Sequence, residues 1–351
     1  MRSACLRLLL ASAFVLPLVA ASAQDAPDPG GPPPKSKAPD APVRDPNITP
    51  LTVNVNLVNV YFSVRDKSGF ITGLKKDDCS VYEDKAEQKL KNFTQEKNLP
   101  LTIGILLDTS ASQTNVLPLE QDSGARFLKE VLRPKDEAFL ISFDVNVDLL
   151  ADYTNDSREL KRAIDKATIN AASSSAGVPG IGGGPFPTSH PRGTLLYDAV
   201  YLAAHDKLRT ETGRKVIVIL TDGGDQGSQE TIKSAIEAAQ KANVIAYVIL
   251  IADQGFYMSQ GAIYTGSSDM DRLAKETGGR VINVGNNGRK LEDAFDQIQD
   301  ELRTQYLASY TPLNKEPDGK FRKLDIDCGK DKKVQARKGY YAITGDASSD
   351  D

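Results

Sequence analysis

Histidine is scarce in this chain of 351 residues, which has only His190 and His205. Two imidazoles give little material for a zinc centre or a catalytic triad. No G-x-S-x-G motif marks a hydrolase nucleophile, and no Gly-rich phosphate motif follows the first strand of the α/β region. We interpret His205 as a partly exposed residue of a helix. The sequence therefore gives no indication of a zinc enzyme, a triad hydrolase or an enzyme with a Gly-rich phosphate loop.

A strong positive charge is also lacking. The chain has 43 basic and 47 acidic residues, and no long block of one sign stands out. Two of the basic residues, Arg2 and Arg7, lie in a segment that we expect to be removed, which brings the net charge to about −6. Such a mildly acidic chain has no electrostatic footprint for nucleic acid.

Long apolar runs are missing beyond the first 23 residues. That segment has a positive start, the apolar stretch "LRLLLASAFVLPLVA" and the small residues "ASA". This pattern is typical of a signal peptide, so we predict one over 1–23, with cleavage after Ala23. No later segment is apolar enough to span a bilayer. We expect the mature chain to be exported to the periplasm, the cell surface or the medium.

Cysteine is rare as well. Removal of Cys5 leaves Cys79 and Cys328, an even pair in an oxidising compartment. Both positions share a face with apolar strand residues, so both point at a core. Two interpretations stay open: a Cys79–Cys328 disulfide, or two buried thiols that pack as small apolar groups. A bridge would close a very long loop and add roughly 5 kcal/mol in the chain-entropy model.

Composition divides the remaining chain. We predict a disordered Pro-rich linker, an N-terminal β-rich module, an α/β domain, a C-terminal β segment that completes the β module, and a disordered tail. Neither β flank has enough strands to stand alone, which predicts one small β-sandwich from which the α/β domain is inserted. The respective ranges are 24–50, 51–98, 99–305, 306–344 and 345–351.

The α/β region alternates apolar strands with amphipathic helices. Near-continuous Val, Ile and Leu strands predict a doubly wound, mostly parallel sheet with helices on both faces. The expected strands are "LTIGILLD", "EAFLISFD", "KVIVILTD", "VIAYVILI" and "GRVINV". The expected helices cover about 118–132, 156–168, 195–208, 229–242, 269–276 and 289–304.

Oxygen-bearing side chains follow two of these strands and open one helix. The first strand ends in "LLDTSAS", "VIVILTDGGD" ends a later strand, and "GTLLYDAV" begins a helix. Right-handed crossovers bring these junctions to one edge of the sheet. Hydroxyls and carboxylates suit a hard cation, Mg²⁺ first, with Mn²⁺ or Ca²⁺ as alternatives. The predicted metal-site residues are Asp108, Ser110, Ser112, Thr194 and Asp222, with Asp225 as a supporting residue behind them.

These motifs resemble the metal-ion-dependent adhesion site of von Willebrand factor type A (VWA) domains. The resemblance covers about 99–305, and the flanks resemble the bacterial VWFA-related Acidobacterial domain family. It implies that Ser110, Ser112 and Thr194 bind the ion directly, and that Asp108 and Asp222 act largely through water. It further implies a binding or adhesion module, not an enzyme, in which a protein partner offers a carboxylate to the metal. One departure from the family pattern is Cys79, where an aromatic residue is expected after the acid.

Other interpretations fit less well. "LLDTSAS" is similar to the D-T-G-[ST] loop of aspartic proteases, but Ser110 replaces the glycine, a helix follows, and no second copy occurs. A metal-dependent phosphohydrolase-like enzyme with an aspartyl nucleophile would need a second acid where Ser110 stands. A metal-free scaffold on the same fold is the third alternative.

The loop over 171–193 leads directly into Thr194. Its Gly and Ser content predicts mobility, and its position predicts contact with whatever approaches the ion. A plain surface insertion explains the same composition equally well.

Overall fold

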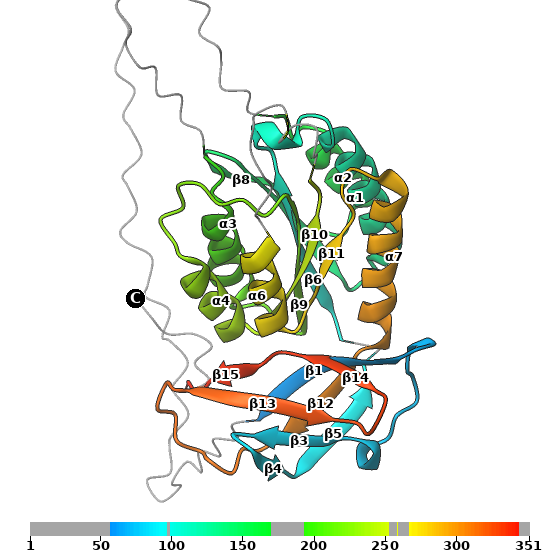
Figure 1. Cartoon of the computed structure of the whole chain (residues 1–351), viewed down its shortest axis with the longest axis vertical. Helices are drawn as coiled ribbons and strands as arrows, with labels where there is room; N and C mark the ends of the chain where they lie inside the picture. Colours follow the sequence, from blue (N-terminus) through cyan, green and yellow to red (C-terminus); the bar gives the residue numbers. More distant parts are fainter. Residues whose placement is uncertain (1–56, 97–98, 170–192, 253–257, 259–266, 344–351) are drawn as a thin grey trace, which may run out of the picture. The chain divides into compact units, whose positions relative to one another are not determined.

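The computed structural model in Figure 1 describes residues 57–96, 99–169, 193–252, 258 and 267–343. The predicted signal peptide, Pro-rich linker and tail lie outside these residues, as do 171–192 of the Gly/Ser-rich loop. Within the described part of the chain, no helix combines the length and the apolar character needed to cross a membrane.

A six-stranded sheet forms the centre of the α/β domain. Its strand order is β11-β10-β9-β6-β7-β8. All neighbouring pairs are parallel except β7 and β8, which are antiparallel. The strands are β6 (Leu101–Asp108), β7 (Glu137–Phe143), β8 (Val147–Thr154), β9 (Arg214–Thr221), β10 (Val244–Leu250) and β11 (Val281–Asn283).

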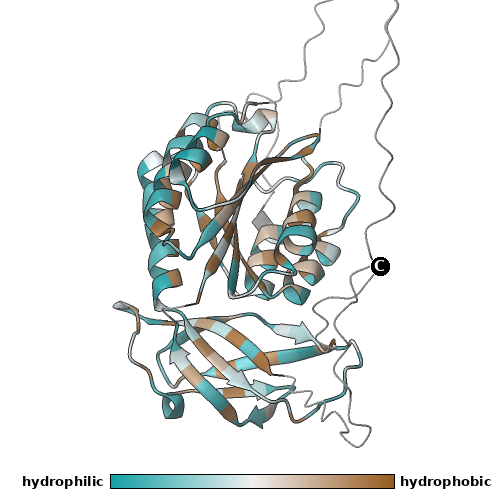
Figure 2. Cartoon of the chain, turned by 180° about the vertical axis from the view of Figure 1, so that it is seen from behind, coloured by the Kyte–Doolittle hydropathy of each residue, from teal (hydrophilic) through white to brown (hydrophobic). Residues whose placement is uncertain are grey.

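Helices cover both faces of this sheet, which confirms the predicted fold class (Figure 1). One face packs against α1 (Leu117–Val131), α2 (Ser157–Ile164) and α7 (Gly288–Thr304). The other packs against α3 (Leu196–Leu202) with its π-helical continuation (Ala203–Leu208), α4 (Ile232–Lys241) and α6 (Ser267–Thr277). Figure 2 shows the hydrophobic residues gathered on the central strands, with hydrophilic residues on the outer sides of the helices.

Strand β6 shows why these sequences form a doubly buried sheet. Ile103, Ile105 and Leu107 pack on the α1 side, while Leu106 packs on the α3 side. Alternate residues of a strand point to opposite faces, so an apolar run is needed where both faces are covered. Gly104 makes room for a large neighbour, because a Cβ there would lie 2.4 Å from the ring of Phe139.

The β module is built from both flanks of the α/β domain. One antiparallel sheet has the order β14-β1-β12-β5, with β2 paired to β1, and the second has the order β15-β13-β3-β4. The first contains β1 (Val58–Asp66), β2 (Gly69–Phe70), β5 (Leu90–Gln95), β12 (Tyr306–Tyr310) and β14 (Lys333–Ala336). The second contains β3 (Ser80–Glu83), β4 (Ala86–Gln88), β13 (Phe321–Asp327) and β15 (Gly339–Tyr341).

One apolar cluster joins the two sheets of the module. It combines β1 and β12 residues such as Phe62 and Tyr306 with β3 and β13 residues such as Val81 and Leu324. Both sheets combine strands from before and after the α/β domain, which alternate in the first sheet and meet at the β13–β3 pair in the second. Each flank therefore depends on the other for its core.

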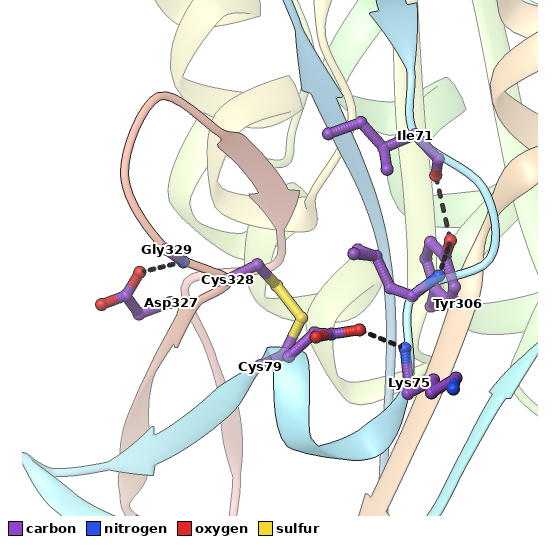
Figure 3. Close-up of a disulfide and its surroundings, with 9 residues drawn as sticks. Ile71, Lys75, Cys79, Tyr306, Asp327, Cys328 and Gly329 are labelled. Carbon is purple, nitrogen blue, oxygen red and sulfur yellow. Dashed lines mark hydrogen bonds between the residues drawn. A yellow bond between two sulfur atoms is a disulfide. The ribbon is translucent and has the colours of Figure 1, made fainter.

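A disulfide joins Cys79 to Cys328 at the margin of this cluster (Figure 3). Cys79 precedes β3 and Cys328 follows β13, and these two strands pair with Ser80 opposite Asp327. Both cysteines are buried. The bond thus covalently ties the N-terminal flank to the C-terminal flank.

The β module contacts the α/β domain through the buried Glu301 of α7. Its carboxylate accepts hydrogen bonds from Ser63 Oγ of β1 (3.1 Å), Gln335 Nε2 of β14 (2.9 Å) and the Tyr247 hydroxyl of β10 (2.9 Å). Arg280 Nε pairs with the second carboxylate oxygen at 2.9 Å. Burial raises the pKa of Glu301, and Arg280 is the largest opposing influence.

This contact lies at the edge where the parallel strands begin. The chain passes from β5 directly into β6, and from α7 directly into β12. Side by side, β5 and β12 form a pair, and Glu96 N donates to Gln305 O. The opposite edge, where β6, β7 and β9 end, is left for the candidate site.

Candidate functional site

The predicted site residues begin at the carboxyl ends of two neighbouring strands. β6 ends at Asp108 and β9 ends at Thr221, directly before Asp222. The two strands are parallel neighbours, with Leu107 opposite Leu220. Both loops therefore leave the sheet at one edge, as doubly wound topology requires.

Asp108 is fully buried, and its carboxylate is held in place from both sides. One oxygen accepts a hydrogen bond from Ser110 N at 3.0 Å, and the other accepts one from Thr221 Oγ1 at 2.6 Å. The side chain is thus fixed by its own loop and by the neighbouring strand.

The two serines of the first loop present their hydroxyls together. Ser110 Oγ lies 3.1 Å from Ser112 Oγ. Ser110 directly precedes the short 3-10 turn η2 (Ala111–Gln113), and Ser112 lies within it. Ser110 is buried and Ser112 is half-buried. The spacing D-x-S-x-S therefore brings two hydroxyl groups side by side, two and four residues after a buried carboxylate.

The second loop is shaped by glycines. Gly223 N donates to Thr221 Oγ1 at 2.9 Å, and Gly224 N donates to the Asp222 carboxylate at 3.1 Å. Gly223 has a φ of +83°, a conformation that side-chain-bearing residues rarely adopt. The turn leaves Asp222 almost fully buried beside the end of β6.

Asp108 and Asp222 interact electrostatically. Burial raises the pKa of Asp108 to about 7, and the negative charge of Asp222 is the second cause. Hydrogen bonds from Ser110 and Thr221 act in the opposite direction on this pKa. Two carboxylates held together inside the protein favour any cation that reaches them.

The backbone of Thr194 joins the same edge. Thr194 N donates to Gln226 O and Gln226 N donates to Thr194 O, both at 3.0 Å, which ties this segment to the loop that carries Asp222. The next residue, Leu195, donates its N–H to Asp144 O at 2.7 Å, just after β7. Asp144 in turn accepts from Thr109 Oγ1 at 2.8 Å. The Thr194 segment is therefore fixed between the β7 and β9 loops.

Asp225 holds the helix that follows Thr194. Its carboxylate accepts hydrogen bonds from Tyr197 N at 3.1 Å and from Ser228 Oγ at 2.6 Å. These bonds anchor the first turn of α3 on the β9 loop. Asp225 thus acts on the site through the placement of α3.

Comparison with known proteins gives matches among solved structures only. No family model matches the sequence, and no curated protein matches it. BatB from Bacteroides thetaiotaomicron is 19% identical, with 58% of this chain and 99% of that chain covered and a TM-score of 0.42. The VWA domain of SpRpn10 is 16% identical, with 57% and 95% covered and a TM-score of 0.38.

A third match is the proximal thread matrix protein 1 of the mussel byssus with a zinc-occupied MIDAS motif. It is 17% identical, with 63% of this chain and 49% of that chain covered and a TM-score of 0.43. This chain thus spans about half of that protein. At such identities and TM-scores the likenesses carry no function across.

The mostly parallel sheet, the helices on both faces and the D-x-S-x-S loop after β6 together match what the sequence resemblance implied. The α/β domain therefore has the doubly wound fold that the resemblance to VWA domains implied. The flanking β module and the disulfide lie outside that domain.

The residues at this edge of the α/β domain fit a hard divalent cation. The donors are carboxylate and hydroxyl oxygens, with no imidazole or thiolate among the predicted ligands. Among the described residues, no group of three or more His, Cys, Asp or Glu side chains could hold a metal ion by itself. An ion at this edge would therefore depend on the hydroxyl groups.

Sequence reasoning missed several residues of this edge. Thr221 and Thr109 hold the loops through side-chain hydrogen bonds, and Thr221 could have been recognised as the hydroxyl residue before Asp222. Glu120 of α1 is buried, and its pKa is raised well above the usual range by burial and by the charges of Asp108 and Asp222. No sequence signal marked Glu120, because an acid in the first turn of an amphipathic helix reads as an exposed residue.

Proposed function

We propose that this chain is an exported binding module of the adhesion type that recognises an acidic group on a protein partner through a divalent cation. The proposed ligands come from three segments of the α/β domain, namely Asp108, Ser110, Ser112, Thr194 and Asp222. The observation that carries the proposal is the buried Asp108, whose pKa burial and the charge of Asp222 raise to about 7, at the start of a loop in which the Ser110 and Ser112 hydroxyls lie 3.1 Å apart.

Each side chain has a defined part in this proposal. Ser110 and Ser112 offer two adjacent hydroxyl oxygens, and Thr194 offers a third from the segment held by Gln226. Asp108 and Asp222 supply the negative charge that attracts the cation. When bound, the ion supplies a Lewis-acidic position that a partner's carboxylate can complete.

Binding of the ion and of the partner would then be thermodynamically linked. In this proposal Asp108 and Asp222 act largely through water, so neutral hydroxyl and water oxygens contact the Mg²⁺ ion and leave it strongly electrophilic toward a partner's carboxylate. The ion would therefore raise the affinity for an acidic partner, and the partner would raise the affinity for the ion by the same factor. We place Mg²⁺ first because the set is all oxygen, with Mn²⁺ and Ca²⁺ as alternatives.

The cellular setting is also a proposal. We infer a signal peptide over 1–23 followed by a Pro-rich tether over 24–50, and membership of the VWFA-related Acidobacterial domain family for the chain as a whole. The disulfide between the two β flanks supports an oxidising compartment, since such bonds persist mainly outside the cytosol.

Calorimetry on protein freed of metal with a chelator and then dialysed tests the ion site. We expect Mg²⁺ or Mn²⁺ to bind wild type with a stoichiometry of about one ion, and not to bind Asp108→Ala. A properly folded wild type that gives no heat and no shift of its unfolding midpoint with either ion would favour the metal-free scaffold.

Partner capture from the envelope of the source cell tests the recognition step. Wild type is compared with Ser112→Ala, with magnesium and with chelator. Ser157→Ala is the matched control, since this serine opens α2 after β8 has run back to the opposite edge of the sheet. We expect capture by wild type and Ser157→Ala in magnesium only. Equal capture with magnesium and with chelator, by both wild type and Ser112→Ala, would contradict an ion-mediated contact.

A phosphatase assay tests the enzyme alternative. We expect no turnover of a chromogenic phosphate monoester in the presence of Mg²⁺. Turnover that disappears in Asp108→Asn would assign the site to a metal-dependent phosphohydrolase-like enzyme instead.

A further inference from the structure

Glu120 is a buried acid with no hydrogen-bond partner among the described residues. It lies in the first turn of α1, with 1% of the residue exposed. Neither of its carboxylate oxygens has a partner in this part of the chain. Buried polar groups are nearly always paired, because an unpaired one loses its hydrogen bonds to water without replacement, and the penalty is larger for a charged group. We therefore expect Glu120 to accept a hydrogen bond from a bound water or ligand in the functional protein.

The position of Glu120 connects it with the proposed ion site. The charges of Asp108 and Asp222 both act on its carboxyl group. No hydrogen bond joins Glu120 to either aspartate among the described residues, and the three acids do not form a group that could hold a metal directly. Glu120 therefore interacts with the charges of both aspartates without forming a three-acid metal group with them.

A second unpaired acceptor lies on the same stretch of chain. Gln113 ends η2, directly after the two serines, and is fully buried. Its Nε2 donates to Ile251 O at 3.5 Å, but its Oε1 has no partner in the described part of the chain. Two buried acceptors next to a proposed cation site need hydrogen-bond donors. Water molecules bound to a cation are strong donors of this kind.

We propose that Glu120 is a third acid of the ion site, and that its carboxylate accepts a hydrogen bond from water bound to the ion. This inference rests on the proposed function. Glu120 is then a positioning residue, since it orients an ion-bound water and adds a third negative charge without touching the ion.

Two consequences follow from a third acid. Three carboxylates outweigh the two positive charges of the ion, so the ion binds more tightly and attracts a partner's carboxylate less strongly than a two-acid site would. A residue that acts through water also favours an ion that keeps its water. Mg²⁺ retains several waters in proteins, whereas Ca²⁺ takes more protein oxygens, so Glu120 should favour Mg²⁺.

Substitution of Glu120→Gln tests the proposal against a matched control, Glu130→Gln, an exposed acid at the other end of α1. Affinities for Mg²⁺ and Ca²⁺ are measured by calorimetry, and stability is measured by urea unfolding in chelator. We expect Glu120→Gln to weaken Mg²⁺ binding about 10-fold to 100-fold, as loss of a residue that supports a metal ligand does elsewhere. Ca²⁺ binding should weaken less, and Glu130→Gln should leave both unchanged.

The stability readout separates this role from a structural one. In chelator, Glu120→Gln should unfold at the same urea concentration as wild type or a higher one, because an amide avoids the cost of burying a group that is ionised in the unfolded chain. A variant that is less stable in chelator and keeps its Mg²⁺ affinity would show that Glu120 serves packing alone. Equal Mg²⁺ affinity in wild type and Glu120→Gln would overturn the proposed role of Glu120 without contradicting the ion site itself. Absence of ion binding in wild type would overturn both.

Discussion

Asp108→Asn should stabilise the metal-free protein at neutral and alkaline pH. In the folded chain, burial and the charge of Asp222 raise the pKa of Asp108 from 3.8 to about 7. Because a tenfold change in proton affinity corresponds to about 1.4 kcal/mol, ionising this buried carboxylate costs up to about 4 kcal/mol. Asparagine has nearly the same shape, carries no charge, and can still accept from Ser110 N. We expect a gain of about 2–4 kcal/mol at pH 8.

The cost of ionising Asp108 changes the stability curve in a defined pH window. Between about pH 4 and 7, Asp108 is ionised in the unfolded chain and still protonated in the folded one, so the stability of wild type falls as the pH rises. Above pH 7 the full cost is present, and below pH 4 it is absent. The difference between Asp108→Asn and wild type should therefore grow from near zero at pH 4 to its full value by pH 7.

Urea unfolding in chelator, measured across this pH range, is the assay. Asp122→Asn is the control, because Asp122 is an exposed acid on α1 and should show no such trend. Addition of Mg²⁺ at 100 times its dissociation constant should then stabilise wild type by about 2.7 kcal/mol and leave Asp108→Asn unchanged. An Asp108→Asn variant that is less stable than wild type at pH 8 in chelator would show that ionisation of Asp108 does not destabilise the folded chain.

Two further predictions concern the β module. Replacing Cys79 and Cys328 by alanine together should lower the free energy of unfolding by about 5 kcal/mol, because their bond closes a loop of 249 residues; urea unfolding that changes by less than about 1 kcal/mol would contradict this. Glu301→Gln should lower the free energy of unfolding by about 2 kcal/mol, because it leaves Arg280 without its carboxylate partner. It should not change the affinity for Mg²⁺, because this contact lies at the edge of the sheet opposite the ion site. Glu292→Gln, which removes an exposed ion pair on the same helix, should cost less than about 1 kcal/mol in the same denaturation assay.

The central strands could be predicted because their burial leaves a clear mark on the sequence. β6, β9 and β10 are buried along their whole length, and each reads as an unbroken apolar run. The antiparallel edge strand β8 was missed. Its residues are half-buried or exposed, as in the case of Leu149, so "VDLLADYT" shows neither alternation nor a continuous apolar run.

Only one face of strand β1 can be predicted from the sequence. The alternation of Val58, Val60, Phe62 and Val64 indicates a strand with one buried face, and these residues do lie in the core of the β module. Tyr61 on the opposite face is also buried, against the core of the α/β domain, and Ser63 bonds Glu301. A contact between domains is invisible to periodicity, because polar residues such as Ser63 read as solvent-facing until their partners are known.

The helix predicted over 195–208 lies where expected, but only its first part is α-helical. α3 ends at Leu202, and a π-helical turn continues to Leu208. A widened turn shifts the hydrogen-bond pattern by one residue and leaves no distinct mark on an apolar pattern this short. At the candidate site, the motif residues could be named from spacing, whereas Glu120 could not, since its burial depends on how α1 packs beneath the loop.

The most direct test of the ion site is anomalous diffraction from crystals of the chain soaked in Mn²⁺. The account predicts one strong peak at the carboxyl edge of the sheet, within coordination distance, about 2.0–2.4 Å, of the hydroxyl oxygens of Ser110, Ser112 and Thr194. A peak elsewhere, or no peak at an Mn²⁺ concentration that saturates the protein in solution, would contradict it.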